Sequence, residues 1–88
     1  MARSWRYFGT RQVREARAFA QSGGIAVHEN LYKLRGHRTC HLLAPDEATL
    51  IAAGRALGLG PERLHRSNTV HFDLFGEPLE RALARCEA

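Results

Sequence analysis

The chain has few cysteines, and their arrangement marks neither a metal site nor a redox site. Cys40 and Cys86 lie far apart, without a CxxC pair and without a secretory segment. Disulfides are rare in reducing compartments, so we expect both thiols to be reduced. A zinc site built on cysteine pairs is excluded by the same spacing.

Long apolar runs are also missing. No stretch approaches the roughly 18 apolar residues of a membrane span, and the first twenty residues hold five arginines without an apolar run of signal-peptide length. We therefore expect a cytoplasmic protein with no membrane partner. The sequence also lacks internal repeats, low-complexity segments, a Walker loop and the HExxH and GxSxG motifs, which removes several classes of enzyme.

The composition is that of one small globular domain. The chain has 88 residues, of which 44% are hydrophobic and 25% are charged. A domain of this size can bury one core and form a surface cleft, but it cannot build a deep active site. We expect a single domain over residues 1–88, with a basic N-terminal arm and helix over 1–24 and a sheet-containing core over 25–88.

The hydrophobic pattern changes between the period of a helix and that of a strand. Helices are predicted over 10–22 with Thr10 as N-cap, over 46–57 with Asp46 as N-cap, and from about 77 onward, with a short helical turn over 61–65. Extended segments are predicted over 5–8, 25–31, 37–43 and 70–75, with a hairpin about Gly36.

The order of these elements predicts the fold class. Residues 37–75 form a strand–helix–strand unit, and such connections join parallel strands with a right-handed crossover in nearly every known case. We therefore expect an α+β fold, in which a mixed sheet of three or four strands is covered by two or three helices.

Two stretches place polar residues among apolar ones at the period of a strand. They are Cys40-His41-Leu42 and Val70-His71-Phe72-Asp73-Leu74. Residues two apart on a strand share a face, so His71 and Asp73 should lie together while Val70, Phe72 and Leu74 point into the core. With the strand of His41 beside them, His41, His71 and Asp73 become candidate catalytic residues and candidate ligands of a divalent metal ion.

The polar residues also fit a purely structural role, in which they brace loop backbone. His65 is expected at the end of a helical turn, where the helix dipole favours a protonated imidazole without catalysis. His28 and Glu29 point to opposite faces of one strand, so only one of them can join the site. Cys40 should face the core, away from His41, which argues against a nucleophilic Cys–His pair.

The net charge of +4 belongs entirely to residues 1–22, where five arginines face only Glu15. Arginines interleaved with aromatic residues suit phosphate contacts and base stacking. The candidate nucleic-acid-binding residues are Arg3, Trp5, Arg6, Arg11, Arg14 and Arg17. A solvated helix face together with a docked strand explains the same pattern without a ligand.

Residues 25–85 carry a pattern of short motifs. It runs through Val27, Cys40-His41-Leu42, Leu57-Gly58, His65, His71-Phe72-Asp73 and Arg81-Ala82. This pattern resembles a family of small bacterial and phage domains of unknown function, whose members carry a Cys-His strand motif and a later His-Tyr-Asp motif. The family pattern also has Val-Asp-Asp where this chain has Val27-His28-Glu29. The resemblance implies the fold and the site and no particular reaction.

Three classes of function follow. The first is a module that binds nucleic acid or another phosphate-containing ligand through the arginine segment and carries a His/Asp surface site. The second is a small hydrolase, metal-dependent or acid–base, that acts on a phosphate-containing substrate through His41, His71 and Asp73. The third is a protein-interaction domain, for instance a homodimer through an exposed sheet edge, with structural histidines. The missing enzyme motifs favour the first class over the second.

Overall fold

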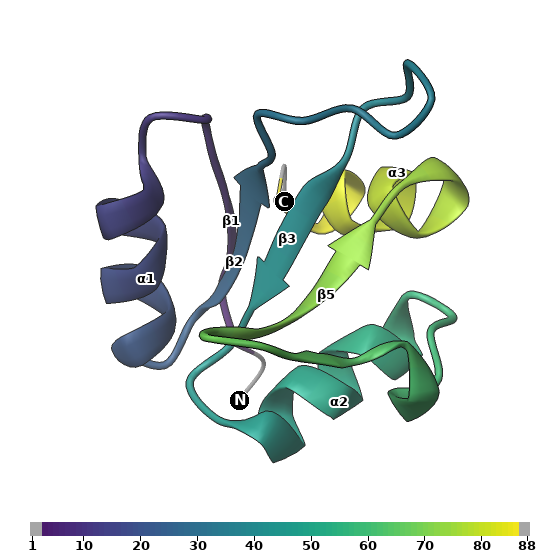
Figure 1. Ribbon diagram of the computed structural model, residues 1–88. Helices are drawn as coiled ribbons and strands as arrows, with labels where there is room; N and C mark the ends of the chain where they lie inside the picture. Colours follow the sequence, from purple (N-terminus) through teal and green to yellow (C-terminus); the bar gives the residue numbers. More distant parts are fainter. Residues whose placement is uncertain (1–2, 87–88) are drawn as a thin grey trace.

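The computed structural model describes residues 3–86, which form a five-stranded sheet with three α-helices (Figure 1). The strands are β1 (Trp5–Phe8), β2 (Ile25–Glu29), β3 (Cys40–Leu43), β4 (His65–Arg66) and β5 (Val70–Leu74). The helices are α1 (Val13–Gln21), α2 (Glu47–Ala56) and α3 (Gly76–Cys86), with a short 3-10 helix η1 (Pro61–Arg63). The predicted α+β class is confirmed, with one strand more than the largest sheet expected.

The strand order of the sheet is β1-β2-β3-β5-β4. β1 is parallel to β2, and the other neighbouring pairs are antiparallel. Residues 5–8, expected as an edge strand or an arm, therefore form the first edge strand. In the ladders Val27 pairs with Leu42 and Leu42 pairs with Phe72, so these residues form one apolar row across the sheet.

The predicted parallel pairing within residues 37–75 is wrong, because β3 and β5 are antiparallel. The cause is β4 (His65–Arg66), a strand that the sequence does not predict. The helical turn predicted over 61–65 is present as η1 (Pro61–Arg63), and only its last residue, His65, belongs to β4 instead. β4 is antiparallel to β5 and hence parallel to β3, so the crossover through α2 ends in β4. β5 then returns as a hairpin between them. A strand of two residues has no detectable period in the sequence.

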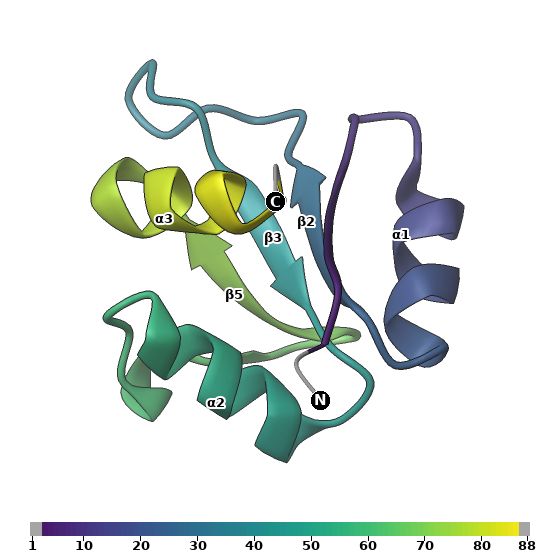
Figure 2. The ribbon, with the colours of Figure 1, turned by 180° about the vertical axis from the view of Figure 1, so that it is seen from behind.

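One face of the sheet packs against α2 and α3, as Figure 2 shows from behind. From the strands this core contains the buried residues Ile25, Val27, Cys40, Leu42, Phe72 and Leu74. The helices contribute Leu50, Ala53, Leu79 and Ala82, and Leu57 follows directly after α2. Val70, expected in this core, is instead 37% exposed, since it pairs with Arg66 at the end of the hairpin.

The opposite face is covered over only part of its width. Phe8, Ala26 and Leu43 pack there against Ala16 and Ala20 of α1. In Figure 1 the same face of β3 and β5 is turned toward the viewer, and no helix lies in front of it. This uncovered half is where polar side chains of β3, β4 and β5 can meet.

The two predicted N-caps have different outcomes. The Thr49 N–H donates to Asp46 Oδ1 over 2.7 Å, so Asp46 caps α2 as predicted. Thr10 does not cap α1, because the helix begins only at Val13. Gly9 and Gln12 instead close a turn, in which the Gln12 N–H donates to Gly9 O over 3.0 Å.

None of the helices within residues 3–86 combines the length and the apolar character that crossing a membrane requires.

The connection between β2 and β3 is a ten-residue loop, 30–39, with a tight turn at its tip. The turn residues Arg35 and Gly36 have φ of 51° and 81°, and Leu34 and His37 exchange backbone hydrogen bonds of 2.9 and 2.8 Å. Positive φ at both turn residues is typical of the two-residue hairpin turn, so the turn about Gly36 is confirmed.

The extended segment predicted over 25–31 is too long, since β2 ends at Glu29.

Gly54 allows α2 to approach β5 closely. A Cβ atom at this position would lie 2.6 Å from the ring of Phe72, which is fully buried. We expect Gly54→Ala to lower the free energy of unfolding, because the overpacking cost of about 1–3 kcal/mol exceeds the gain in helix propensity of about 1 kcal/mol. Urea unfolding measures the change, and Arg55→Ala, at an exposed neighbour, serves as control with little change expected. A stabilised Gly54→Ala protein would show that the Phe72 ring has room to move.

Candidate metal centre

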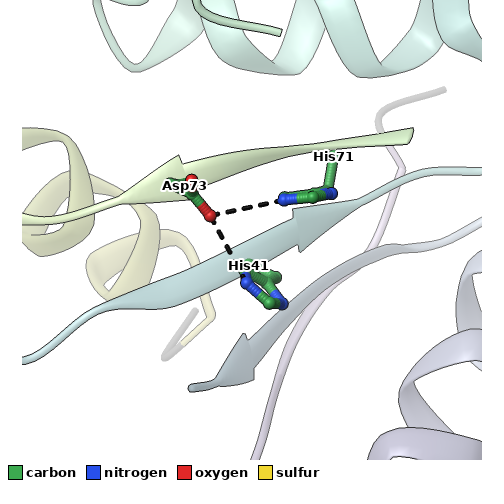
Figure 3. A group of neighbouring side chains, drawn as sticks. All are labelled: His41, His71 and Asp73. Carbon is green, nitrogen blue, oxygen red and sulfur yellow. Dashed lines mark ion pairs between the residues drawn. The ribbon is translucent and has the colours of Figure 1, made fainter. Parts of the chain in front are cut away.

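The strand period of β5 directs its polar side chains to the uncovered face. Phe72 and Leu74 are fully buried against the helices, so His71 and Asp73 point the other way. In the β3–β5 ladder His41 pairs directly with Asp73. His41, His71 and Asp73 therefore lie on neighbouring strands with their side chains together on one face, as the sequence predicts (Figure 3).

The carboxylate of Asp73 is the centre of the cluster. Its Oδ1 atom lies 3.3 Å from Nε2 of His41 and 3.4 Å from Nε2 of His71. Its Oδ2 atom lies 3.1 Å from Nε2 of His65. Three imidazoles from three strands thus surround one carboxylate, with one oxygen shared by two rings and the other contacting the third.

A backbone carbonyl fixes the orientation of His71. Nδ1 of His71 lies 2.7 Å from Thr69 O. A carbonyl oxygen can only accept, so Nδ1 carries a proton and donates it. In the neutral ring the lone pair is then on Nε2, which faces Asp73 Oδ1. Metal-binding histidines are commonly held by this kind of hydrogen bond from the other ring nitrogen.

Asn30 contacts His41 in a related way. The Tyr32 N–H donates to Asn30 Oδ1 over 3.3 Å, which leaves the Asn30 amide nitrogen to approach His41 Nε2 at 3.4 Å. As the amide nitrogen is a donor, Nε2 of His41 offers a lone pair. Burial and, after it, the nearby charge of His71 lower the pKa of His41, while the charge of Asp73 partly opposes this shift. His41 is therefore held as a neutral ring at pH 7.

Two of the distances within the cluster match the edge of a tetrahedral metal site. The ligand atoms of His41, His71 and Asp73 all lie within 4.8 Å of one another. A tetrahedral Zn²⁺ ion with bonds of about 2.0–2.1 Å separates neighbouring ligand atoms by about 3.3–3.4 Å. The two distances from Asp73 Oδ1, 3.3 and 3.4 Å, have this value. Two imidazoles and a carboxylate are also a donor set that binds transition metals.

Of two histidines beside the cluster, His65 differs from its sequence-based interpretation and His28 agrees with it. His65 lies in β4, not at the end of a helical turn, and its ring stacks on that of His71 at 5.3 Å between centroids. His28 pairs with His41 across the ladder, so it joins the site face while Glu29 points to the other. Nε2 of His28 donates to Thr10 O over 3.2 Å, which assigns it to bracing the loop before α1. His65 reaches the cluster through the β4–β5 hairpin, which the sequence does not predict.

Cys40 takes no part in the site, as predicted. It is fully buried on the helix-covered face, and its Sγ lies 3.7 Å from Glu29 Oε1. Burial and the charge of Glu29 raise the pKa of Cys40 to about 12, so the thiol is not an available nucleophile.

Glu29 also accepts hydrogen bonds of 2.8 Å from the Tyr7 hydroxyl and from Nε of Arg38. These bonds connect β2 to β1 and to loop 30–39.

The first three candidate nucleic-acid residues divide between the two faces of the sheet, because Arg3 and Trp5 line one pocket and Arg6 lies on the other face. Arg3 donates to Gly23 O over 2.8 Å. Trp5 packs on the core under α3, with Arg85 over its ring at 5.2 Å from the centroid. Arg6 lies on the opposite face, over the ring of Phe8. Each of these side chains therefore has an intramolecular contact, and the three do not share one surface.

The arginines around α1 also separate. Arg11 and Arg14 are exposed, in the turn before the helix and in its first turn. Arg17 lines a pocket of about 200 Å³ together with His41 and His71. Of the six residues chosen from the sequence for nucleic-acid binding, Arg17 is the one whose side chain borders the histidine cluster.

Comparisons with protein-family models, with curated proteins and with solved structures found no match for this chain. The resemblance to small bacterial and phage domains therefore stays a prediction from the sequence motifs, and the function has to be inferred from the site itself.

Proposed function

We propose that this protein binds a divalent transition metal ion through His41, His71 and Asp73 and uses the ion in the hydrolysis of a phosphate-containing substrate. The observation that carries the proposal is the orientation of the two rings. Nε2 of His71 presents a lone pair toward Asp73 Oδ1, because its Nδ1 is held by Thr69 O. Nε2 of His41 faces the same oxygen, and its lone pair is contacted by the Asn30 amide, which a metal ion would replace.

Three converging acceptor atoms need a positive charge between them, which either protons or a metal ion can supply. Protonation of both rings is unfavourable, because their centroids lie 4.5 Å apart and two imidazolium ions at that distance repel. The lowered pKa of His41, due mainly to burial, works in the same direction. A single divalent ion satisfies all three acceptors at once, so the donor set favours a metal over protons.

The three candidate ligands all come from the uncovered face of the sheet, so a bound ion would remain accessible to water from the solvent side. Three protein ligands plus an exchangeable water are typical of catalytic zinc sites, where the bound water has a pKa of about 7. In phosphate ester hydrolysis the water oxygen forms a bond to phosphorus, the bond from phosphorus to the leaving oxygen breaks, and that oxygen takes up a proton. His65, the most exposed of the three rings at Asp73, is placed to transfer that proton.

Metal binding is the direct test of this proposal. Calorimetric titration of untagged protein with Zn²⁺ should show one binding site at pH 7.5. His41→Ala and His71→Ala should each weaken binding at least tenfold, because each removes a ligand, and lowering the pH to 5.5 should weaken wild-type binding because protons compete for the imidazoles. His37→Ala, in the exposed turn of loop 30–39, is the matched control and should bind like wild type. Equal affinities for all four proteins would refute the assignment.

Asp73→Asn separates an interaction of Asp73 with the imidazoles, which a ligand role requires, from a brace to backbone N–H groups. In metal-free protein the variant loses the charge that opposes the downward pKa shift of His41, so that pKa should fall further. A folded-state pKa below the usual value of about 6.5 costs stability as pH falls through that value. The difference in melting temperature between wild type and Asp73→Asn, measured in EDTA, should therefore be small at pH 8 and larger at pH 5.5.

If the Asp73 carboxylate instead accepted hydrogen bonds from backbone N–H groups, the variant would behave differently. Loss of these bonds should lower the melting temperature by a similar amount at both pH values, because a backbone donor does not titrate. That result would contradict the metal-centre proposal at Asp73.

A further inference from the structure

Two more pockets adjoin Asp73, and Phe75 lines both of them. One, of about 230 Å³, lies against loop 30–39 and is lined by Tyr32 and Lys33. The other, of about 290 Å³, lies against η1 and β4 and is lined by Arg63 and His65. With the pocket at Arg17, His41 and His71, three hollows therefore surround the histidine cluster.

Exposed aromatic rings flank the cluster on this side. Tyr32 is 76% exposed and Phe75 is 41% exposed, although both are large enough to be core residues. The Tyr32 backbone is held in place, since its N–H donates to Asn30 and its carbonyl accepts from the Thr39 hydroxyl over 2.9 Å. Rings that stay exposed beside a polar centre, on a fixed backbone, are suited to stacking on a flat ligand.

Each pocket also contains one flexible cationic side chain, and these are Arg17, Lys33 and Arg63. Asp73 is the one acidic residue among the residues that line the three pockets. A divalent ion bound at Asp73 would neutralise that charge as well. The whole surface therefore favours a ligand with negative charges at several separate points.

We propose that the three pockets form one binding surface for single-stranded nucleic acid, defined by Arg17, Tyr32, Lys33, Arg63 and Phe75. In this single-strand surface Tyr32 and Phe75 stack on bases, and the three cations contact phosphates on either side of the metal centre. The inference deepens the proposed function and rests on it in one respect, because it names the substrate whose phosphodiester bond the metal centre would hydrolyse.

A single strand fits these features better than a duplex. The aromatic rings line pockets beside the sheet, and a base reaches such a ring only when it is unstacked from its neighbours. Stacking on aromatic side chains combined with a basic track is the usual way in which proteins hold single strands without sequence preference. The surface differs from the segment that the sequence indicated, since Arg11 and Arg14 lie outside it and Arg17 belongs to both.

The test is fluorescence anisotropy with labelled twenty-residue oligothymidine and oligouridine, titrated in EDTA at several salt concentrations. Wild-type protein should bind both, with affinity that falls as salt rises because released counterions drive the association. Tyr32→Ala and Phe75→Ala should each weaken binding by about tenfold, the effect of one lost stacking contact. Lys33→Ala and Arg63→Ala should each reduce the slope of log affinity against log salt by about one.

Matched variants control for exposure and for charge. Leu31→Ala removes an exposed apolar side chain from the same loop, outside the three pockets, and should bind like wild type. The double variant Arg11→Ala/Arg14→Ala removes two exposed cations outside the surface and should retain the affinity of wild type within a factor of about three at physiological salt. Melting curves confirm that each variant is folded.

The outcomes separate this inference from the metal proposal. Zn²⁺ binding with no oligonucleotide binding overturns the single-strand surface and leaves the metal centre intact. Oligonucleotide binding without Zn²⁺ binding refutes the metal centre while the surface stands. If Arg11→Ala/Arg14→Ala loses oligonucleotide binding while Tyr32→Ala and Phe75→Ala bind like wild type, the interface lies at α1 and the inference is overturned. Equally tight binding to duplex DNA or polyglutamate would also overturn it.

Discussion

The packing of Phe72 against α2 is the contact on which the rest of the site depends. Its ring is fully buried and lies so close to the helix that only a glycine fits at position 54. This contact sets the phase of β5, because a shift of one residue would turn every side chain of the strand to the other face. His71 and Asp73 reach the uncovered face for that reason. The polar cluster is thus a direct result of apolar packing on the reverse side of the sheet.

The topology of the sheet adds the remaining members of the cluster. β5 lies between β3 and β4, so the side chain of Asp73 has a histidine-bearing strand on each side. α1 covers only the first strands of this face, which leaves the cluster open to ligands. A parallel β3–β5 pair, as the sequence suggested, would place His41 beside β5 in another register. The two-residue strand β4 therefore decides both the topology and the inclusion of His65.

Local patterns in the sequence predict part of this arrangement, and long-range contacts determine the rest. Alternation along β3 and β5 is a property of each strand alone, so the shared face of His41, His71 and Asp73 could be predicted. The cap at Asp46 is local in the same sense. β4 is too short to have a period, and its pairing is a tertiary contact. The rings of His71 and His41 are oriented by contacts with Thr69 O and Asn30. These contacts cannot be predicted from the hydrophobic pattern.

Asn30 contacts both His41 of the proposed metal centre and the backbone of Tyr32 in the proposed single-strand surface. Its amide oxygen holds the backbone of Tyr32, and its amide nitrogen lies against the lone pair of His41. An ion that takes this lone pair ends the contact with Asn30 and changes the forces that position the loop. Linkage requires the effect to be reciprocal, so that any factor by which the ion alters affinity at the loop is also the factor by which a loop ligand alters affinity for the ion. Asn30 would thereby couple the proposed metal centre to the proposed single-strand surface.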